Sequence, residues 1–166
     1  MTLHVLTACS RPENLERVAR SLAATPCHWH VRFDIERQYV GGQEVKNVLL
    51  DEIHDGWVFF LDDDTLMHPK LYRRLGTLFE EGGPDAFVVS QRHSVLGILH
   101  AAPENVHVGG IDIGQVVARR TLIGDTRIPN TYWGDGEFWS EILPKGKVVY
   151  LDEVLSYQNA LAQKEE

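Results

Sequence analysis

The chain has 166 residues, of which 43% are hydrophobic and 24% are charged, and its formal net charge is -8. This length suffices for one hydrophobic core but hardly for two, and the composition is that of a globular protein rather than a disordered one. A protein that binds nucleic acid or an anionic membrane through its charge needs clustered lysine and arginine residues. The negative net charge of this chain argues against such a cluster. We therefore expect one domain over residues 1–166 and no nucleic-acid-binding patch.

We expect no targeting segment. Its first residues lack the basic stretch and long apolar run of a signal peptide, and no stretch approaches the roughly 20 apolar residues of a membrane helix. Cys9 and Cys27 do not have the Cys-x-x-Cys spacing, so we expect two reduced thiols, with a disulfide or a nucleophilic Cys9 as the alternatives. These features predict a cytoplasmic protein without a membrane span.

The first ninety residues predict alternating strands and helices. In chain order we expect a strand over 3–7, a helix opened by Ser10, a strand over 29–35, a helix over 45–53, a strand over 57–61, a helix after Pro69 and a strand over 86–90. Ser10 and Glu13 have the spacing of a capping box. The helix after Pro69 is expected to turn four side chains toward the core: Leu71, Leu75, Leu78 and Phe79. This alternation is typical of an open doubly wound sheet.

The second half is less regular. Strands are expected over 95–100, 111–118 and 148–151, and a helix within 132–142. We find no internal repeat and no low-complexity linker.

Three consecutive aspartates, Asp62, Asp63 and Asp64, follow the apolar strand WVFFL. Open α/β sheets bind ligands beyond the carboxyl ends of their strands. Adjacent carboxylates repel and raise one another's pKa unless a cation compensates them. Mg²⁺ and Mn²⁺ typically take one or two carboxylates together with phosphate oxygens. The triplet therefore predicts a divalent-metal site, and a solvated turn that caps the next helix is the alternative.

A phosphatase motif is a second interpretation of the triplet. In the pattern DxDx(T/V) the first aspartate is a nucleophile after a buried strand, and Asp62 and Asp64 occupy its acidic positions. The position that requires Thr or Val is Leu66, while Thr65 comes one residue early. This spacing disfavours a nucleophilic aspartate.

Four segments resemble, in their order and approximate spacing, the motifs of the inverting GT-A fold glycosyltransferases, especially family 2. The segments are VLTACSRPENLERVARSL, GGQEVKNVLLDEIHDGWVFFLDDDTLMHPKLYRRL, YWGDGEFWSEI and GKVVYLDEVLSYQN. They are similar to the first strand with its Arg-Pro turn, the glycine loop and helix that lead to the DxD motif, the acidic motif before a helix, and the last strand. The resemblance implies a GT-A-like open doubly wound mixed sheet flanked by helices. About residues 1–92 would form a Rossmann-like half that binds the nucleotide sugar, and about 93–166 a small acceptor half.

The resemblance also implies roles for single residues. The nucleotide sugar is assigned to Thr7, Arg11, Asp34 with Glu36 as a further candidate, Lys46, Asn47, Asp62 and Asp63. Asp64 is the implied ligand of Mn²⁺ or Mg²⁺, and Asp62 is a second candidate. Asp135 is the implied catalytic base, Glu137 is its alternative, and Trp133 and Gly110 are assigned to the acceptor. Without the resemblance, Arg11 is equally well a surface residue and Asn47 a polar helix residue.

Inverting sugar transfer is a single displacement, which needs a carboxylate base and positive charge on the leaving diphosphate. The sequence departs from the family where many relatives have a histidine metal ligand, because the matching segment reads Ser156-Tyr157-Gln158-Asn159. Because this histidine is missing, metal binding is expected to rest on Asp64, phosphate and water. The sequence also has a glycine where relatives often have a second acid beside the base.

Two further sets of side chains are candidates for the site. Arg119 and Arg120 suit a diphosphate or an anionic acceptor, or form a solvated basic pair. Four histidines, none of them in an HxH or HExxH pattern, have structural or site roles: His68, His93, His100 and His107.

The sequence thus predicts a metal-dependent, inverting glycosyltransferase that moves a sugar from a nucleoside-diphosphate donor, a UDP-sugar, to a hydroxyl acceptor of unknown identity. One alternative is a catalytically silent nucleotide- or sugar-binding module of the same fold. The other is a nucleotidyltransferase, which is expected to have a glycine-rich loop after its first strand, whereas ACSRPEN contains no glycine.

Overall fold

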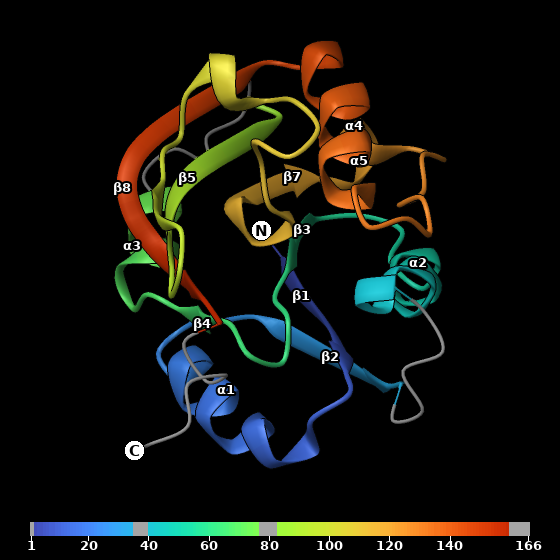
Figure 1. The fold of residues 1–166 in the computed structure, drawn as a ribbon, viewed down its shortest axis with the longest axis vertical. Helices are drawn as coiled ribbons and strands as arrows, with labels where there is room; N and C mark the ends of the chain where they lie inside the picture. Colours follow the sequence, from blue (N-terminus) through green and yellow to red (C-terminus); the bar gives the residue numbers. More distant parts are fainter. Residues whose placement is uncertain (1, 35–39, 77–82, 160–166) are drawn as a thin grey trace.

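A computed structural model describes residues 2–34, 40–76 and 83–159. Its strands form one mixed sheet with helices on both faces (Figure 1). The strands are β1 (Leu3–Cys9), β2 (His28–Phe33), β3 (Trp57–Phe60), β4 (Leu66–Met67), β5 (Ala86–His93), β6 (Gly97–Leu99), β7 (Val116–Arg119) and β8 (Val148–Gln158). The α-helices are α1 (Leu15–Leu22), α2 (Gln43–Asp51), α3 (Lys70–Gly76), α4 (Arg120–Ile123) and α5 (Gly134–Ile142).

The strand order determines where a site can form. The sheet runs β2-β1-β3-β7-β5-β8-β4, and β6 pairs with β5. Strand β1 is parallel to β2 and β3, β7 is antiparallel to both β3 and β5, and β5 is parallel to β8. Five strands, β1, β2, β3, β5 and β8, therefore run in one direction, and their carboxyl ends lie along one edge of the sheet. This is the edge at which open α/β sheets bind ligands.

The sheet separates two hydrophobic cores. Strand β3 turns Val58 and Phe60 toward the core that α2, α4 and α5 cover, and Trp57 and Phe59 toward the core under α1 and α3. Because strand side chains alternate between the two faces, a strand covered on both sides must be apolar throughout. All four side chains are at least 98% buried, which confirms the expectation for WVFFL.

The capping box expected at Ser10 and Glu13 is wrong. Residues Pro12–Asn14 form a 3₁₀ turn without a side-chain cap, and α1 begins only at Leu15. The backbone N–H and hydroxyl of Ser10 donate instead to Asp63, far along the chain. A tertiary partner has therefore displaced the local one.

The second half differs from expectation in three elements. The strand expected over 95–100 is confined to β6, and the region 111–118 divides into a 3₁₀ turn (Ile113–Gln115) followed by β7. Strand β8 extends seven residues beyond the expected end at Leu151. In the first half, the short strand β4 was not expected. Four residues of the sequence-based predictions, Ile35, Glu36, Leu78 and Phe79, lie outside the described residues.

Both cysteines are free, as expected, with Cys9 buried and Cys27 partly buried. Burial raises the pKa of each thiol, which disfavours the thiolate that a nucleophilic cysteine requires. In the described ranges, every helix is too short or too polar to cross a membrane.

Candidate active site

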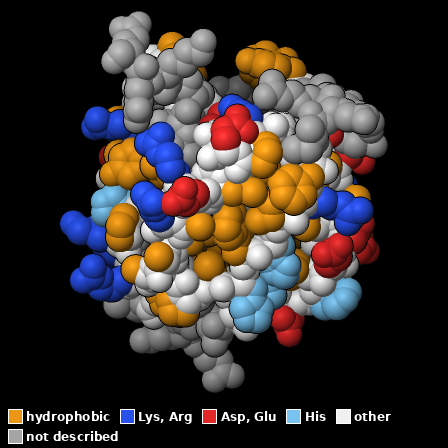
Figure 2. Space-filling view, turned by 90° about the horizontal axis from the view of Figure 1, so that it is seen from below, with side chains coloured by type: hydrophobic (Ala, Val, Ile, Leu, Met, Phe, Trp, Pro, Cys, Tyr) orange, Lys and Arg blue, Asp and Glu red, His pale blue; other side chains and the backbone are white. Residues whose placement is uncertain are grey.

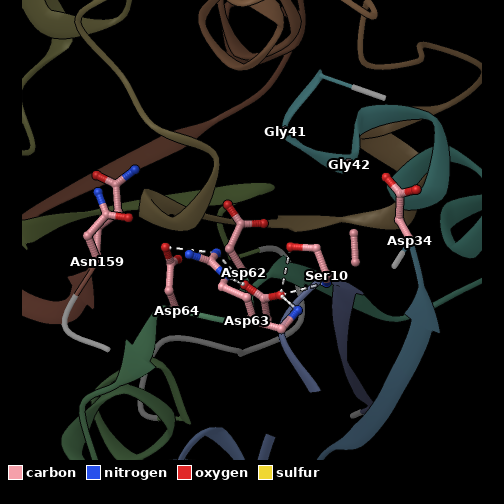
Figure 3. A pocket seen from close by; sticks show the side chains of 11 residues that line it. Ser10, Asp34, Gly41, Gly42, Asp62, Asp63, Asp64 and Asn159 are labelled. Atoms are coloured by element: carbon pink, nitrogen blue, oxygen red, sulfur yellow. Dashed lines mark hydrogen bonds and ion pairs between the residues drawn. The ribbon is translucent and has the colours of Figure 1, made fainter. Parts of the chain in front are cut away.

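A cavity of about 260 Å³ lies at the carboxyl ends of β1 and β3. Figure 3 shows the side chains that line it. They come from the turn after β1, the end of β2, the start of α2, the triplet after β3 and the end of β8: Ala8, Ser10, Arg11, Asp34, Gly41, Gly42, Asp62, Asp63, Asp64, Gln158 and Asn159. The triplet thus lies where the sequence placed it.

Asp63 fixes the turn after β1. Its Oδ2 accepts from Ser10 N (2.6 Å), Ser10 Oγ (3.2 Å) and Arg11 N (2.7 Å), and its Oδ1 accepts from Arg11 Nε (2.9 Å) and pairs with Nη2. The residue is 1% exposed. A carboxylate offers about four lone pairs, so these bonds use its acceptor capacity. Asp63 therefore serves to hold the wall of the cavity in place.

Asp64 shares the guanidinium of Arg11 with Asp63. The distance from Arg11 Nη2 to Asp64 Oδ2 is 2.9 Å. Burial and the neighbouring Asp62 raise the pKa of Asp64, while Arg11 opposes this shift. The Arg11 side chain remains 30% exposed in the cavity, so it can also approach an anion.

Lys46 is buried beneath Asp62. Its side chain is 1% exposed, and Nζ lies 2.7 Å from Asp62 Oδ1. Burial lowers the pKa of Lys46, but the carboxylates of Asp62 and Asp135 outweigh burial and raise it overall. Lys46 therefore stays charged, and its ion pair holds the carboxylate of Asp62 in place.

Two glycines allow α2 to carry Lys46 to this position. Gly41 and Gly42 have φ of 55° and 71°, a conformation that side chains other than glycine rarely adopt. A Cβ on Gly42 would lie 2.7 Å from the Cβ of Ala8. The glycines thus let α2 begin directly against the end of β1.

A second cavity, of about 350 Å³, adjoins the first. Gly41, Asp62 and Gln158 line both. The second cavity has a polar floor and an apolar rim. Its floor includes Lys46, Asp112 and Asp135, and its rim includes Leu96, Leu99, Tyr132 and Trp133. A ligand in the first cavity and another in the second would meet at Asp62.

Asp135 lies in the first turn of α5, which packs closely against neighbouring backbone. A Cβ on Gly134 would lie 2.2 Å from Pro129 O, and one on Gly136 would lie 2.7 Å from Val108 Cα. The sequence Gly-Asp-Gly is therefore what lets the helix present Asp135 to the second cavity. The pKa of Asp135 is raised by burial, while Lys46 opposes the shift. Gln43 Nε2 donates to Asp135 Oδ1 at 3.2 Å.

Asp112 is a further carboxylate at this site, and sequence reasoning missed it. Its pKa is raised to about 7 by burial and by the charges of Asp135 and Asp62. Its side chain accepts from Gly114 N at 2.9 Å and forms a capping box with Gln115. The Asp-x-x-Gln spacing of a capping box was the available signal, but a cap by itself does not indicate a cavity.

Two of the residues assigned to the nucleotide have structural partners. Thr7 is fully buried, donates to Leu61 O (2.7 Å) and accepts from Trp29 Nε1 (2.9 Å). Asn47 donates to Ile128 O (2.8 Å) and accepts from Ile128 N (2.9 Å). Neither side chain lines either cavity. Both tie distant segments of chain together behind the cavity walls.

The remaining candidates divide between the site and its surroundings. Trp133, Gly110 and His93 line the second cavity. Glu137 is exposed and accepts from Thr131 Oγ1 at 3.2 Å. The other candidates line neither cavity: His68, His100, His107, Arg119 and Arg120. The two arginines donate to backbone carbonyls of neighbouring loops.

The donor atoms of the first cavity fit a hard divalent cation. Asp62 and Asp64 supply carboxylate oxygens, and the amide side chains of Gln158 and Asn159 line the same cavity. Within the described residues, the triplet does not bring three carboxylate oxygens within 4.8 Å of one another. This arrangement suits Mg²⁺ or Mn²⁺, which bind through one or two carboxylates and complete their shell with phosphate and water.

No protein-family model matches the sequence, and no curated protein matches it. Solved structures match its fold. S. aureus TarS has a TM-score of 0.76 at 15% identity, over 95% of this chain and 36% of that chain. S. aureus TarS 1-349 in complex with UDP-GlcNAc has a TM-score of 0.69 at 13% identity, over 95% and 58%. A197 from STIV has a TM-score of 0.63 at 15% identity, over 96% and 83%.

This chain therefore spans about a third of the length of the first of these structures. At such identities the likeness shows the fold. The chain has a GT-A-like α/β fold with a mixed sheet flanked by helices, which confirms the fold class predicted from the sequence.

Proposed function

We propose that this chain is a metal-dependent glycosyltransferase that moves a sugar from a UDP-sugar to an acceptor hydroxyl with inversion. The observation that carries this proposal is the pair of adjoining cavities that meet at Asp62. One has the charge and oxygen donors to hold a diphosphate with its cation, and the other contains carboxylates suited to take a proton. A neighbour of the same fold was solved with UDP-GlcNAc, which supports the choice of donor.

The first cavity is the donor site in this proposal. Asp34, which follows β2, lies across the cavity from Asp64 (Figure 3), where the nucleoside would bind, and Arg11 offers a cation to the diphosphate. Asp64, with Asp62, would hold Mn²⁺ or Mg²⁺ together with the amide oxygens at the end of β8. When bound, this cation supplies positive charge to the leaving diphosphate.

The second cavity is the acceptor site. Asp135 takes the proton of the acceptor hydroxyl while that oxygen forms a bond to the anomeric carbon and the bond from this carbon to the diphosphate oxygen breaks. A base is most effective when its pKa lies near the working pH, and the pKa values of Asp135 and Asp112 are both raised toward that range. Trp133 and Tyr132 give the rim two aromatic faces on which a sugar or an apolar acceptor can pack.

Replacing Asp64 by asparagine is expected to weaken Mn²⁺-dependent binding of UDP at least tenfold, because the carboxylate would hold the cation that supplies positive charge to the diphosphate. The fold should persist, since Arg11 keeps its bonds to Asp63. Isothermal titration calorimetry with UDP, with and without Mn²⁺, measures this effect. A nucleotide that binds the native state must also raise the melting temperature, by an amount set by its concentration relative to Kd.

The matched control for this titration is Asp125→Asn, an exposed carboxylate outside both cavities, which should bind UDP as the wild type does. Equal binding by Asp64→Asn and wild type would contradict the metal assignment. If UDP, GDP, TDP and CDP all fail to bind in the presence of Mn²⁺ or Mg²⁺, the donor site itself is wrong. Binding of UDP-sugars without any transfer or hydrolysis would indicate a silent binding module.

A further inference from the structure

Three histidines gather at the opposite end of the sheet from the proposed donor site. His4 is the second residue of β1, and the parallel pairing of β1 with β2 places it opposite His28. His30 lies two residues beyond His28, so it projects from the same face of β2. The donor cavity is reached at Ala8, four residues and roughly 13 Å further along β1. On the lower face of the molecule, histidine side chains reach the surface beside hydrophobic ones (Figure 2).

The ring nitrogens of these histidines are close enough to share one ion. One nitrogen of each ring lies within 4.8 Å of the others, and within the described ranges this is the only such group of His, Cys, Asp or Glu. His4 Nδ1 lies 3.0 Å from His30 Nε2, and the rings of His4 and His28 are 5.4 Å apart, edge to face. Two nitrogens on one tetrahedral Zn²⁺ lie roughly 3.3 Å apart, given Zn–N bonds of about 2.0–2.1 Å. Small rotations of the rings therefore suffice to bind a metal.

The most buried of the three has an unpaired ring nitrogen. His4 is 9% exposed, and its Nε2 is buried without a hydrogen-bond partner. Its ring packs against Gly56, where a Cβ would lie 3.3 Å from Nε2. The nitrogen of His4 that faces the cluster is therefore Nδ1, which lies beside His30.

The pKa shifts of His4 and His30 also suit a metal. Burial, and then the charges of His30 and His28, lower the pKa of His4, and burial and His28 lower that of His30. Neutral imidazole is the form that binds metals, so the lowered pKa values of His4 and His30 favour metal binding. Asp55 lies close enough to act on His4, and Glu52 on His30, and both favour positive charge there.

We propose that His4, His28 and His30 form a Zn²⁺-type transition-metal site that joins the edge strand β2 to β1, separate from the aspartate cavity. Three imidazoles select zinc and its neighbours over Mg²⁺ and Mn²⁺, which prefer oxygen ligands. His28 is exposed, so the fourth position is open to water or to a nearby carboxylate. The bound metal would stabilise β2, the strand that leads directly to Asp34.

Calorimetric titration of Zn²⁺ into untagged, chelator-treated protein tests this site. We expect one Zn²⁺ per chain in the wild type, and binding at least tenfold weaker in His28→Ala, whose side chain is exposed and should not affect folding. Co²⁺ should give the visible absorption of a four-coordinate ion in the wild type, and this band should be lost in His28→Ala. The matched control is His107→Ala, an exposed histidine outside the cluster, which should bind Zn²⁺ as the wild type does.

The same titration separates this site from the donor site. Asp64→Asn should leave Zn²⁺ binding unchanged, and an excess of Mg²⁺ should not displace the zinc. The proposal is wrong if the wild type shows no saturable binding of Zn²⁺, or if His28→Ala binds it as tightly as the wild type. Loss of binding in Asp64→Asn with retention in His28→Ala would instead place the zinc in the aspartate cavity.

Discussion

Replacing Lys46 by methionine is expected to lower the free energy of unfolding by about 3 kcal/mol at pH 7. Methionine fills a similar volume, but it leaves Asp62 without the ammonium that lies 2.7 Å away. Asp112 and Asp135 also lose the positive charge that lowers their pKa values. Removing one partner of a buried ion pair typically costs about 3–5 kcal/mol, and the lower end applies because the Asp62 side chain is 27% exposed.

The size of this loss should depend on pH. The pKa of Asp112 is raised from 3.8 to about 7, so the folded protein binds this proton more tightly than the unfolded chain. Such a group stabilises the fold fully below its unfolded pKa, and its contribution is lost as the pH rises through the folded pKa. The wild type should therefore lose stability between about pH 4 and about pH 7. In Lys46→Met this decline should be steeper, because the carboxylates have lost their cation.

Urea unfolding at pH 5 and pH 8, followed by circular dichroism, measures both effects. The matched control is Lys145→Met, because Lys145 pairs with Glu141 at 2.9 Å but its side chain is 51% exposed. Exposed pairs contribute little, so the control should change the free energy of unfolding by less than about 0.5 kcal/mol. A Lys46→Met variant that is as stable as the wild type at pH 8 would contradict the role of Lys46 as a buried counter-charge.

Replacing Asp135 by asparagine is expected to lower the transfer rate by about 10²–10⁴-fold while UDP binding is retained. An amide cannot take the acceptor proton, whereas it keeps the shape of the side chain and the contact with Gln43. Asp135 lines only the second cavity, so the donor site is untouched. Single-turnover transfer from a UDP-sugar, with calorimetric titration of UDP on the same variant, separates the two quantities.

Two further variants decide between the neighbouring acids. Glu137→Gln should transfer sugar at the wild-type rate, because Glu137 is exposed and lines neither cavity. An equal loss in Glu137→Gln would move the role of base to Glu137. Asp112→Asn tests the other carboxylate of the second cavity, and a loss confined to that variant would make Asp112 the base.

The location of the site was predictable because it depends on local patterns. A strand covered on both faces must be apolar, so WVFFL marked a central strand, and the triplet after it had to lie at the ligand-binding edge. The two glycines before α2 and the Gly-Asp-Gly of α5 likewise signal close approaches of backbone. The aspartate triplet could therefore be placed at this edge from its local pattern, whereas Asp135 was proposed through the resemblance to family 2 glycosyltransferases, and the roles of these residues stay predictions.

What each aspartate does depends on partners far away in the chain, and no local pattern encodes them. Asp63 is bound by Ser10 and Arg11, which lie 53 and 52 positions away. Lys46 meets Asp62 only because α2 packs beside the end of β3. The pKa of Asp112 is raised only in the folded chain, where burial and the charges of Asp135 and Asp62 act on it.

Strand β8 shows a different failure. The strand was expected over 148–151, but it continues to Gln158. Its pairing with β5 shifts register between Val89 and Gln91, so that the polar residues turn outward before the strand resumes. A bulge of this kind depends on the partner strand, and β8 must continue for Gln158 to reach the cavity.

The histidine cluster contains one pair with a local sequence pattern and one residue that only the fold brings close. His28 and His30 have the HxH spacing of metal-binding strands, a signal that the sequence-based predictions missed. The third member, His4, lies 26 positions from His30 and is brought beside it by the parallel pairing of β1 and β2.

A crystal structure of the protein with Mn²⁺ and UDP, using the anomalous scattering of manganese, tests the donor site most directly. We expect one manganese peak beside the carboxylate of Asp64, the diphosphate between that ion and Arg11, and the uracil base near Asp34. Density for UDP outside this cavity, or a manganese peak away from Asp64, would contradict the assignment of the aspartate triplet to a nucleotide sugar and its metal.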